Sequence, residues 1–290
     1  MRGTRRGLLA VIAGTGLLLS GTAASSQPLP PQLTAEQIAA IVQNPNSRAA
    51  DRTNDQRRKP EQMLAFIGIR PGITALDLSA AGGYTTELLA RALGPTGRVF
   101  GQSQQRDPNR SPPAAPEGNS NPSATLAPQQ ARPASGPRPS AVALAERDAN
   151  LKSAGVQAAT IFVVTRPFDD PVPPELRDAQ FDLATLIFNY HDLGHMDVDR
   201  AAMNRAVFGA LKPGGIYVIA DHSGRPGTGI SEAGTLHRIE EAFLRQEVEA
   251  AGFKLQDTGN FLRNRNDPRD KNTPDPPQPK DQFVLKFVKP

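Results

Sequence analysis

Short strand-like runs alternate along the chain with segments in which apolar residues recur every three or four positions. Runs of four to eight apolar residues are typical of buried strands, and the longer period is typical of helices packed on them. Five such runs come first and two late runs predict a closing antiparallel hairpin: 73–78, 98–102, 159–165, 181–188, 216–220, 253–256 and 283–288. The pattern predicts an α/β fold with a mostly parallel, seven-stranded sheet between two layers of helices.

Several helix boundaries can be placed from local signals. Thr34 and Gln37 form a capping box ahead of an apolar stretch, and Pro60 suits the first position of a helix that Gly68 ends. Asp197 is predicted to cap a helix that runs to residue 211, and residues 231–251 are predicted to form one long amphipathic helix. The charged segment 48–59 reads either as a solvated face or as a lid over the carboxyl end of the sheet.

The N-terminus has the layout of a secretory signal peptide. Arg2, Arg5 and Arg6 precede an uncharged apolar run over 7–19, and small residues follow. The run is too short to span a bilayer comfortably, so no stable membrane insertion is expected. The paired arginines also resemble a twin-arginine signal. We therefore expect a periplasmic or secreted protein.

A second segment, residues 104–140, interrupts the alternation. It contains nine prolines and many small or polar residues, and such a composition cannot bury enough apolar surface to offset the entropy of ordering. The predicted organisation is a signal peptide over 1–26, a leader and helical lid over 27–59, and one domain over 60–290 with a disordered insertion at 104–140.

Composition narrows the classes of function. The chain has 290 residues, 38% of them hydrophobic, which is enough for a substantial core. The net charge is only +4 and the Lys and Arg residues are scattered, whereas a nucleic-acid platform needs a clustered basic face, so no nucleic-acid partner is predicted. The absence of cysteine excludes disulfides, thiol nucleophiles and cysteine-based zinc sites.

The stretch LDLSAAGGYTTELLA, residues 76–90, is the strongest candidate for a ligand site. It reads as a strand ending in Asp77, a tight turn of small residues over 79–83, and a helix that begins near Tyr84. In such a turn the backbone can approach a ligand closely while the first helical N–H groups point at it. An ordinary strand-to-helix turn without a ligand remains the alternative.

The histidines add a second candidate. All four lie in the second half of the chain: His191 and His195 follow the fourth predicted strand, His222 follows the fifth, and His237 lies in the helix after the fifth. Ligands bind at the carboxyl ends of parallel strands, so we take His191 as the candidate general base and His222 as the second choice, with Asp192 or Asp221 to orient them. His191, His195, Asp192 and His222 could supply nitrogen and oxygen ligands to a metal. A metal-binding pair of His191 and His195 needs a continuous helix, which Leu193 and Gly194 interrupt, so no metal is predicted.

The order of LDLSAAGGY, FDLATLIFNYHD and LKPGGIYVIADH, followed by a helix and a hairpin, resembles the class I S-adenosylmethionine-dependent methyltransferases. Residues 51–72, DRTNDQRRKPEQMLAFIGIRPG, are similar to a group of exported bacterial methyltransferase-like proteins. The resemblance implies a doubly wound Rossmann-like methyltransferase fold, S-adenosyl-L-methionine as cofactor and a small-molecule acceptor. It indicates no oligomeric state.

The resemblance also assigns residues. It implies that Asp77 meets the amino group of the cofactor and that Asp169 lies near the adenine. The position at which an acidic residue usually holds the ribose falls at Gln102 or Ser103. Asn189 would line the transfer centre and, with His191, His222 and Asp192, make the catalytic set. Tyr190 and Asn189 would shape the acceptor pocket. The loop beneath the cofactor would comprise Ser79, Ala81, Gly82, Gly83 and Tyr84.

Three departures keep a second function open. The family usually has glycine at the positions of Ser79 and Ala81, and Gln102 replaces a charged hydrogen bond by a neutral one. These changes predict weaker cofactor affinity and motivate the alternative of a non-catalytic nucleoside- or small-molecule-binding protein. A nicotinamide-dependent oxidoreductase is disfavoured because AAGGY lacks the G-x-G-x-x-G spacing.

Overall fold

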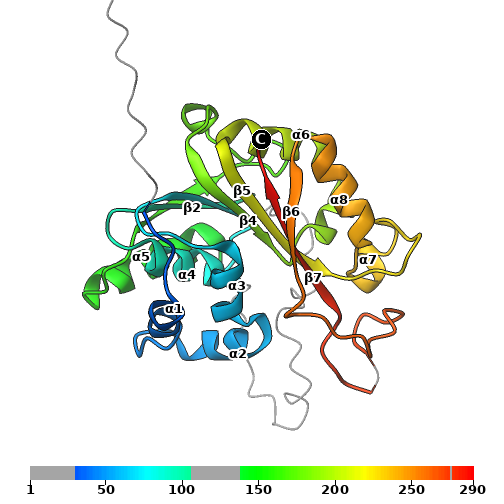
Figure 1. Ribbon diagram of the computed structural model, residues 1–290, viewed down its shortest axis with the longest axis horizontal. Coiled ribbons are helices and arrows are strands. Elements are labelled where there is room, and N and C mark those ends of the chain that lie inside the picture. The colour runs from blue at the N-terminus through cyan, green and yellow to red at the C-terminus, as the bar shows by residue number, and fades with distance from the viewer. Residues whose placement is uncertain (1–29, 106–137, 275) are drawn as a thin grey trace, which may run out of the picture.

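The computed structural model describes residues 30–105, 138–274 and 276–290 (Figure 1). The predicted signal peptide and nearly all of the predicted insertion lie outside these residues, and both stay predictions. At the edges of the insertion, residue 140 already belongs to a helix.

A seven-stranded sheet forms the centre of the described part of the chain (Figure 1), with strand order β3-β2-β1-β4-β5-β7-β6. Strands β1 to β5 pair in parallel, β7 pairs antiparallel with β5, and β6 pairs antiparallel with β7. The predicted mostly parallel sheet with a final antiparallel hairpin is confirmed. The strands are β1 Thr74–Leu78, β2 Arg98–Ser103, β3 Thr160–Thr165, β4 Phe181–Ile187, β5 Leu211–His222, β6 Lys254–Gly259 and β7 Gln282–Val288.

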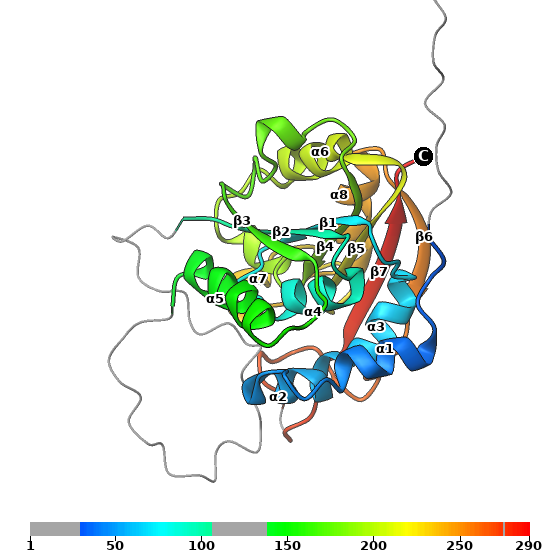
Figure 2. The same ribbon diagram turned by 90° about the vertical axis from the view of Figure 1, so that its left-hand side faces the viewer.

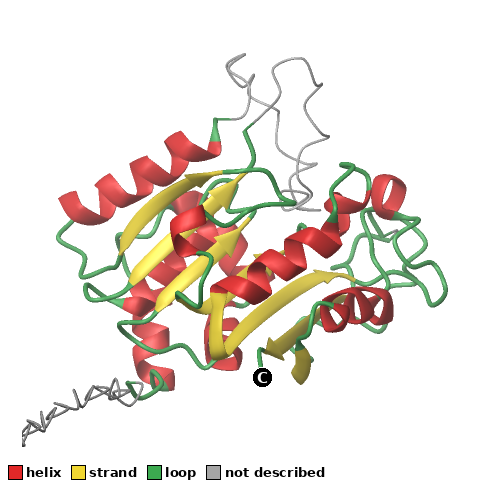
Figure 3. Cartoon of the chain, turned by 90° about the horizontal axis from the view of Figure 1, so that it is seen from above, coloured by secondary structure: helices red, strands yellow, loops and turns green. Residues whose placement is uncertain are grey.

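Helices cover both faces of the sheet, as Figures 2 and 3 show. One face packs against α1 Ala35–Val42, α3 Pro60–Ile67, α4 Tyr84–Leu93 and α5 Ser140–Ser153, and α2 Ala49–Arg58 lies beside them. The other face packs against α6 Arg200–Ala210 and α8 Glu241–Ala250, with α7 Ala233–Leu236 and the short turns η3 Pro174–Leu176 and η4 His191–Gly194 completing the set. Each face has its own buried apolar cluster, so the sheet is doubly wound. No described helix combines the length and the apolar character needed to cross a membrane.

The local signals at the first helices are confirmed. Thr34 and Gln37 make the reciprocal capping box of α1. Pro60 is the first residue of α3, and Gly68 ends that helix in the left-handed conformation with φ of 73°. These boundaries depend on residues only a few positions apart, which explains why the sequence located them.

Two predicted helix boundaries are wrong. The single helix over 231–251 is two helices, because α7 ends at Leu236 and His237 takes a left-handed φ of 50° before α8 begins at Glu241. The cap of α6 is Asp199, whose side chain accepts from Ala202 N–H at 2.8 Å, and Asp197 lies in a preceding turn with φ of 60°.

Helix α2 is fixed to the sheet by a buried ionic network. Arg147 of α5 binds both carboxylate oxygens of Asp51 at 2.8 and 3.0 Å and contacts Glu87 of α4 at 2.6 Å. Its Nε also donates to the carbonyl oxygen of Gly82 at 2.6 Å. One guanidinium thus joins α2, α4, α5 and the small-residue turn.

Replacing Arg147 by Met should release α2 from the sheet. Asp51 would lose its counter-ion while Glu87 would keep Arg91, and removal of one partner of a buried ion pair costs about 3–5 kcal/mol. Because α2 has little apolar surface of its own, we expect local opening and at least about tenfold faster proteolytic cleavage between residues 48 and 59. The control is Lys152→Met, which breaks the exposed Lys152–Asp148 pair. Equal cleavage of both variants would contradict the assignment.

Candidate functional site

The candidate site lies where the order of the strands reverses. From β1 the chain moves to β2 on one side, whereas β4 pairs on the other side of β1. In open α/β sheets such a reversal leaves a crevice at the carboxyl ends of the strands, and ligands bind there. Asp77 near the end of β1 and residues 188–189 after β4 reach this edge.

Asp77 is a buried carboxylate held by two hydroxyl groups. Its oxygens accept hydrogen bonds from Thr86 Oγ1 at 2.6 Å and from Thr185 Oγ1 at 2.8 Å, the latter on the residue paired with it in β4. Burial raises the pKa of Asp77 to about 6, although these hydrogen bonds and the charge of Arg58 oppose the shift. The carboxylate would gain from a cationic ligand, which would relieve its desolvation.

The turn after Asp77 has strained backbone. Ser79 and Ala81 have φ of 54° and 47°, in the left-handed region that favours glycine. Ala81 and Gly82 are exposed at the tip, whereas Gly83 is packed so tightly that an added Cβ would lie 2.7 Å from Arg147 Cδ. Strain of this kind clusters at ligand-binding segments, where surrounding contacts hold it in place.

Gln102 supports this turn from inside the protein. Its Oε1 accepts from Ser79 N–H at 3.1 Å, and its Nε2 donates to the Arg166 carbonyl at 2.8 Å. The residue is completely buried. We therefore correct the sequence interpretation of Gln102: both polar atoms of its amide are bonded within the protein, so the residue holds the loop in shape and does not meet a ribose.

Arg58, at the end of α2, lies over the same edge of the sheet. Its guanidinium carbon is 5.4 Å from the centre of the Tyr84 ring and 5.1 Å from that of Phe188. Burial lowers the pKa of Arg58 to about 10, and the neighbouring charge of Arg57 adds to the shift, so the group stays charged at neutral pH. Arg58 is a cation and Asp77 is an anion, and the two lie close enough for each to shift the pKa of the other.

Tyr84 and Phe188 complete the cationic side of the site. Tyr84 donates its hydroxyl to Asp55 of α2 at 2.8 Å. Phe188 has a left-handed φ of 63°, and its ring stacks on His222 with centroids 5.3 Å apart. These contacts join the end of α2 to Tyr84 and Phe188, and the role of residues 27–59 as a lid stays a prediction.

Two further residues that were predicted to belong to the site, Asp169 and Tyr190, differ in exposure. Asp169 is exposed in the loop after β3. Tyr190 is fully buried, donates to Glu247 Oε2 at 2.9 Å and accepts from Asn204 at 2.8 Å. It packs in the core beneath α6 and α8, so the expectation that it shapes an acceptor pocket is wrong.

The four histidines come together at the carboxyl ends of β4 and β5. Ring centroids are 5.4 Å apart for His222 and His191, 5.6 Å for His191 and His237, and 5.8 Å for His237 and His195. The row continues from His222 to the Phe188 ring, and the Arg58 guanidinium lies over both Phe188 and Tyr84. These side chains follow one another along the edge of the sheet. The sequence placed the histidines at this edge but gave no sign that His237 joins them.

His191 lies between two carboxylates. Its Nδ1 is 2.6 Å from Asp221 Oδ1 and its Nε2 is 3.1 Å from Asp192 Oδ1. Burial lowers the pKa of His191, but the charges and hydrogen bonds of Asp221 and Asp192 outweigh it and raise the pKa to about 10. An imidazole that is already protonated cannot remove a proton, so this geometry does not support His191 as a general base.

His222 has the opposite environment. Burial, together with the positive charges of Lys280, His191, Arg238 and Arg58, lowers the pKa of His222 well below its usual value. The ring is neutral, with its Nδ1 3.2 Å from Gln282 Nε2, and β5 and β7 set this contact because the two residues are paired in register. A neutral ring that resists protonation is a weak base, and its place beside Phe188 suits ligand contact better.

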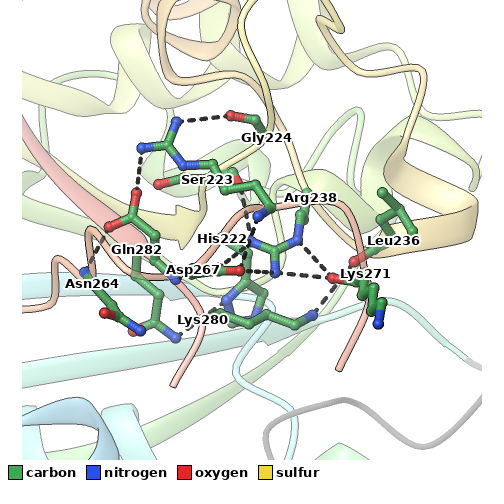
Figure 4. A network of polar contacts seen from close by, with 12 residues as sticks. His222, Ser223, Gly224, Leu236, Arg238, Asn264, Asp267, Lys271, Lys280 and Gln282 are labelled. Atoms are coloured by element: carbon green, nitrogen blue, oxygen red, sulfur yellow. Dashed lines mark hydrogen bonds and ion pairs between the residues drawn. The ribbon is translucent and has the colours of Figure 1, made fainter. Parts of the chain in front are cut away.

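The segment behind His222 is held by Arg238, which is fully buried (Figure 4). Its guanidinium binds Asp267 at 2.8 and 3.2 Å, the Lys271 carbonyl at 3.0 and 3.1 Å, and the Ser223 carbonyl at 3.0 Å. Figure 4 shows these groups beside His222 and Gln282. Arg238 thereby ties the loop between β6 and β7 to the end of β5, a role that no local pattern indicated.

Comparison with known proteins identifies the fold. No protein-family model matches the sequence, and no curated protein matches it significantly. A S-adenosylmethionine-dependent methyltransferase from Aquifex aeolicus superposes with a TM-score of 0.51 at 14% identity, over 89% of this chain and 100% of that one. A putative methyltransferase of Haloferax volcanii, in complex with the activator Trm112, gives 0.49 at 15% identity over 89% and 99%. The protein thus has the Rossmann-like fold of the Aquifex methyltransferase.

Proposed function

We propose that the protein is an S-adenosylmethionine-dependent methyltransferase that acts on a small-molecule acceptor. The observation that carries the proposal is the pair of opposite charges at the strand reversal, the buried carboxylate of Asp77 and the guanidinium of Arg58. The cofactor ends in an α-amino acid group, which carries an ammonium and a carboxylate side by side. A site with one anion and one cation matches that group.

The residues present fit the amino-acid end of the cofactor. Asp77 has two threonine hydroxyls already in place, so its carboxylate is oriented before a ligand arrives. Ala81 and Gly82 leave the tip of the turn free of large side chains. The ribose end lacks its usual acidic partner, because Gln102 takes that position and supports the turn. Most of the specificity should therefore come from the amino-acid end.

When bound, the cofactor would supply a methyl group activated on a sulfonium. The chain would contribute position: Asp77 and Arg58 would orient the amino-acid group, and Phe188, Asn189 and His222 lie at the carboxyl ends of β4 and β5. Holding the reactants in line is one of the main contributions that a protein makes to such a displacement. Covering the edge with α2 would also keep water from the site.

Calorimetric titration tests the proposal with three ligands. S-adenosylmethionine and S-adenosylhomocysteine carry the amino-acid group, whereas methylthioadenosine lacks it. We expect the first two to bind at least about tenfold more tightly than the third, since a charged hydrogen bond contributes about 1.5–3 kcal/mol. Binding without turnover on any acceptor would favour a non-catalytic protein, and no binding of any of the three would overturn the cofactor assignment.

Replacing Arg58 by Ala should weaken S-adenosylhomocysteine about 10- to 100-fold and leave methylthioadenosine nearly unchanged, because only the former has a carboxylate for the guanidinium. Arg98→Ala is the matched control, since Arg98 lies at the opposite end of the sheet, where it contacts Thr74. If Arg58 instead blocks the crevice and repels the cofactor's ammonium, Arg58→Ala would tighten binding, and the assigned role would be wrong.

A further inference from the structure

Three side chains beyond the β4 and β5 strand ends converge on one point. Asp192 Oδ1 lies 3.1 Å from His191 Nε2 and 3.2 Å from His237 Nδ1, and the three potential ligand atoms lie within 4.8 Å of one another. We propose that His191, Asp192 and His237 bind a divalent transition-metal ion, with zinc as the best match. This inference does not depend on the cofactor assignment.

The spacing of the ligand atoms fits a metal ion. With bonds of 2.0–2.1 Å, neighbouring ligand atoms lie about 3.4 Å apart in a tetrahedral site and about 3.0 Å apart in an octahedral one. The two measured separations fall between these values. Two imidazoles with one carboxylate are typical ligands of zinc, iron and cobalt, whereas magnesium prefers oxygen ligands alone.

Groups behind the ligands support the same conclusion. Asp221 Oδ1 is 2.6 Å from Nδ1 of His191, and Asp221 also accepts the backbone N–H groups of His191 and His222 at 2.8 and 2.7 Å. A carboxylate at Nδ1 keeps a proton there, and Nε2 binds the metal when its own proton is released to solvent, an arrangement common to metal-binding histidines. Asn189 Nδ2 donates to Asp192 Oδ2 at 3.0 Å and leaves Oδ1 for the ion.

The backbone is also built to bring these ligands together. His191 and Asp192 lie in the η4 turn, and His237 adopts its left-handed φ of 50° directly beside Arg238, whose guanidinium is fixed by Asp267. Strained residues persist where surrounding contacts hold them, and they cluster at functional sites. If α7 continued through His237, the imidazole would not be brought to Asp192 in this way.

The proposed site is open on one side. The side chain of His191 is 3% exposed, whereas those of His237 and Asp192 are 18% and 22% exposed. Three protein ligands with an open fourth position are typical of metals that contact a substrate or activate water. A hydroxyl or thiol of a small molecule could bind there and lose its proton to solvent.

The test uses the purified full chain after treatment with a chelator. We expect zinc to bind at one ion per chain with micromolar affinity or better, cobalt(II) to give visible absorption bands of a low-symmetry site, and magnesium not to compete. His237→Asn and Asp192→Asn should each weaken zinc at least about 100-fold. Asn tolerates the left-handed backbone of residue 237, so His237→Asn should fold, as circular dichroism can show.

The matched control is His195→Asn, which removes the neighbouring imidazole outside the proposed ligand set. It should bind zinc within about threefold of the parent chain. Three results would each overturn the proposal: no zinc bound at one ion per chain, unchanged affinity in a folded His237→Asn variant, or an equal loss in His195→Asn, which would indicate unspecific binding to the row of histidines.

Discussion

Replacing Asp77 by Asn should weaken binding of S-adenosylmethionine at least about 100-fold without weakening the fold. The amide retains the size of the carboxyl group and can still bond Thr86 and Thr185, the two hydroxyl partners of Asp77. It removes the charge that we propose meets the cofactor's ammonium, and loss of a charged hydrogen bond in a buried site costs about 3 kcal/mol, or at least about 100-fold in affinity. Calorimetric titration measures the affinity.

Asp77→Asn should weaken cofactor binding but should not lower the free energy of unfolding at pH 7. Burial raises the pKa of Asp77 from its usual 3.8 to about 6, so between these values the folded chain binds more protons than the unfolded chain. The contribution of Asp77 to the free energy of unfolding therefore falls as pH rises through this window, by roughly 3 kcal/mol as an upper bound. Asn removes this dependence, so the variant should match or exceed the parent in stability at pH 7.

Urea unfolding at pH 4.5 and pH 7 checks the prediction. The matched control is Asp182→Asn, on β4 at the opposite end of the sheet, where the carboxylate accepts from Thr74 N–H and from Lys212. Loss of that ion pair should lower stability at pH 7, if only slightly. An Asp77→Asn variant that is less stable than the parent at pH 7, or that still binds the cofactor tightly, would contradict the role of Asp77.

This opposition between binding and stability is itself a mark of a site. A buried carboxylate whose ionised form is disfavoured costs the protein stability in the absence of a cation. Such groups are found where function requires them, because most other positions would gain from a neutral residue. Asp77 could be identified from the sequence because it is a carboxylate in an apolar run just before a small-residue turn. No residue of that run can pair with its charge.

Features set by near neighbours in the sequence could be predicted. The strand, turn and helix around Asp77, the capping box of α1 and the start of α3 at Pro60 all depend on spacings of a few residues. The seven strands followed from apolar runs of the expected length, and the parallel arrangement followed from their alternation with helices. Local and global preferences agree at these positions.

Features that depend on residues far apart in the sequence could not be predicted. Gln102 is buried because it caps the turn at Ser79, 23 positions away, and Arg58 reaches the site because Arg147 anchors α2 to α5. The pattern over 231–251 is amphipathic enough for one helix, yet the bonds of Arg238 to residues about 30 positions away fix a break at His237. Tertiary contacts override helix propensity at such places.

Replacing Arg238 by Met should be among the most destabilising single changes in the chain. The substitution leaves Asp267, whose side chain is 1% exposed, as an unpaired buried charge and removes the donors to the Lys271 and Ser223 carbonyls. Breaking a buried ion pair from one side costs about 3–5 kcal/mol. We expect a loss of that size in the free energy of unfolding by urea. Arg245→Met, which breaks an exposed pair with Glu249, should cost less than about 1 kcal/mol.

A second variant separates the charge from the packing. If the loss comes from the stranded carboxylate, Arg238→Met combined with Asp267→Asn should recover part of it, because the amide carries no charge and its oxygen can still accept from a backbone N–H group. The double variant would still lack the bonds that tie the loop between β6 and β7 to Ser223, so the segment beside His222 should remain looser than in the parent. Full recovery of both stability and zinc affinity would mean that Arg238 does not position His237.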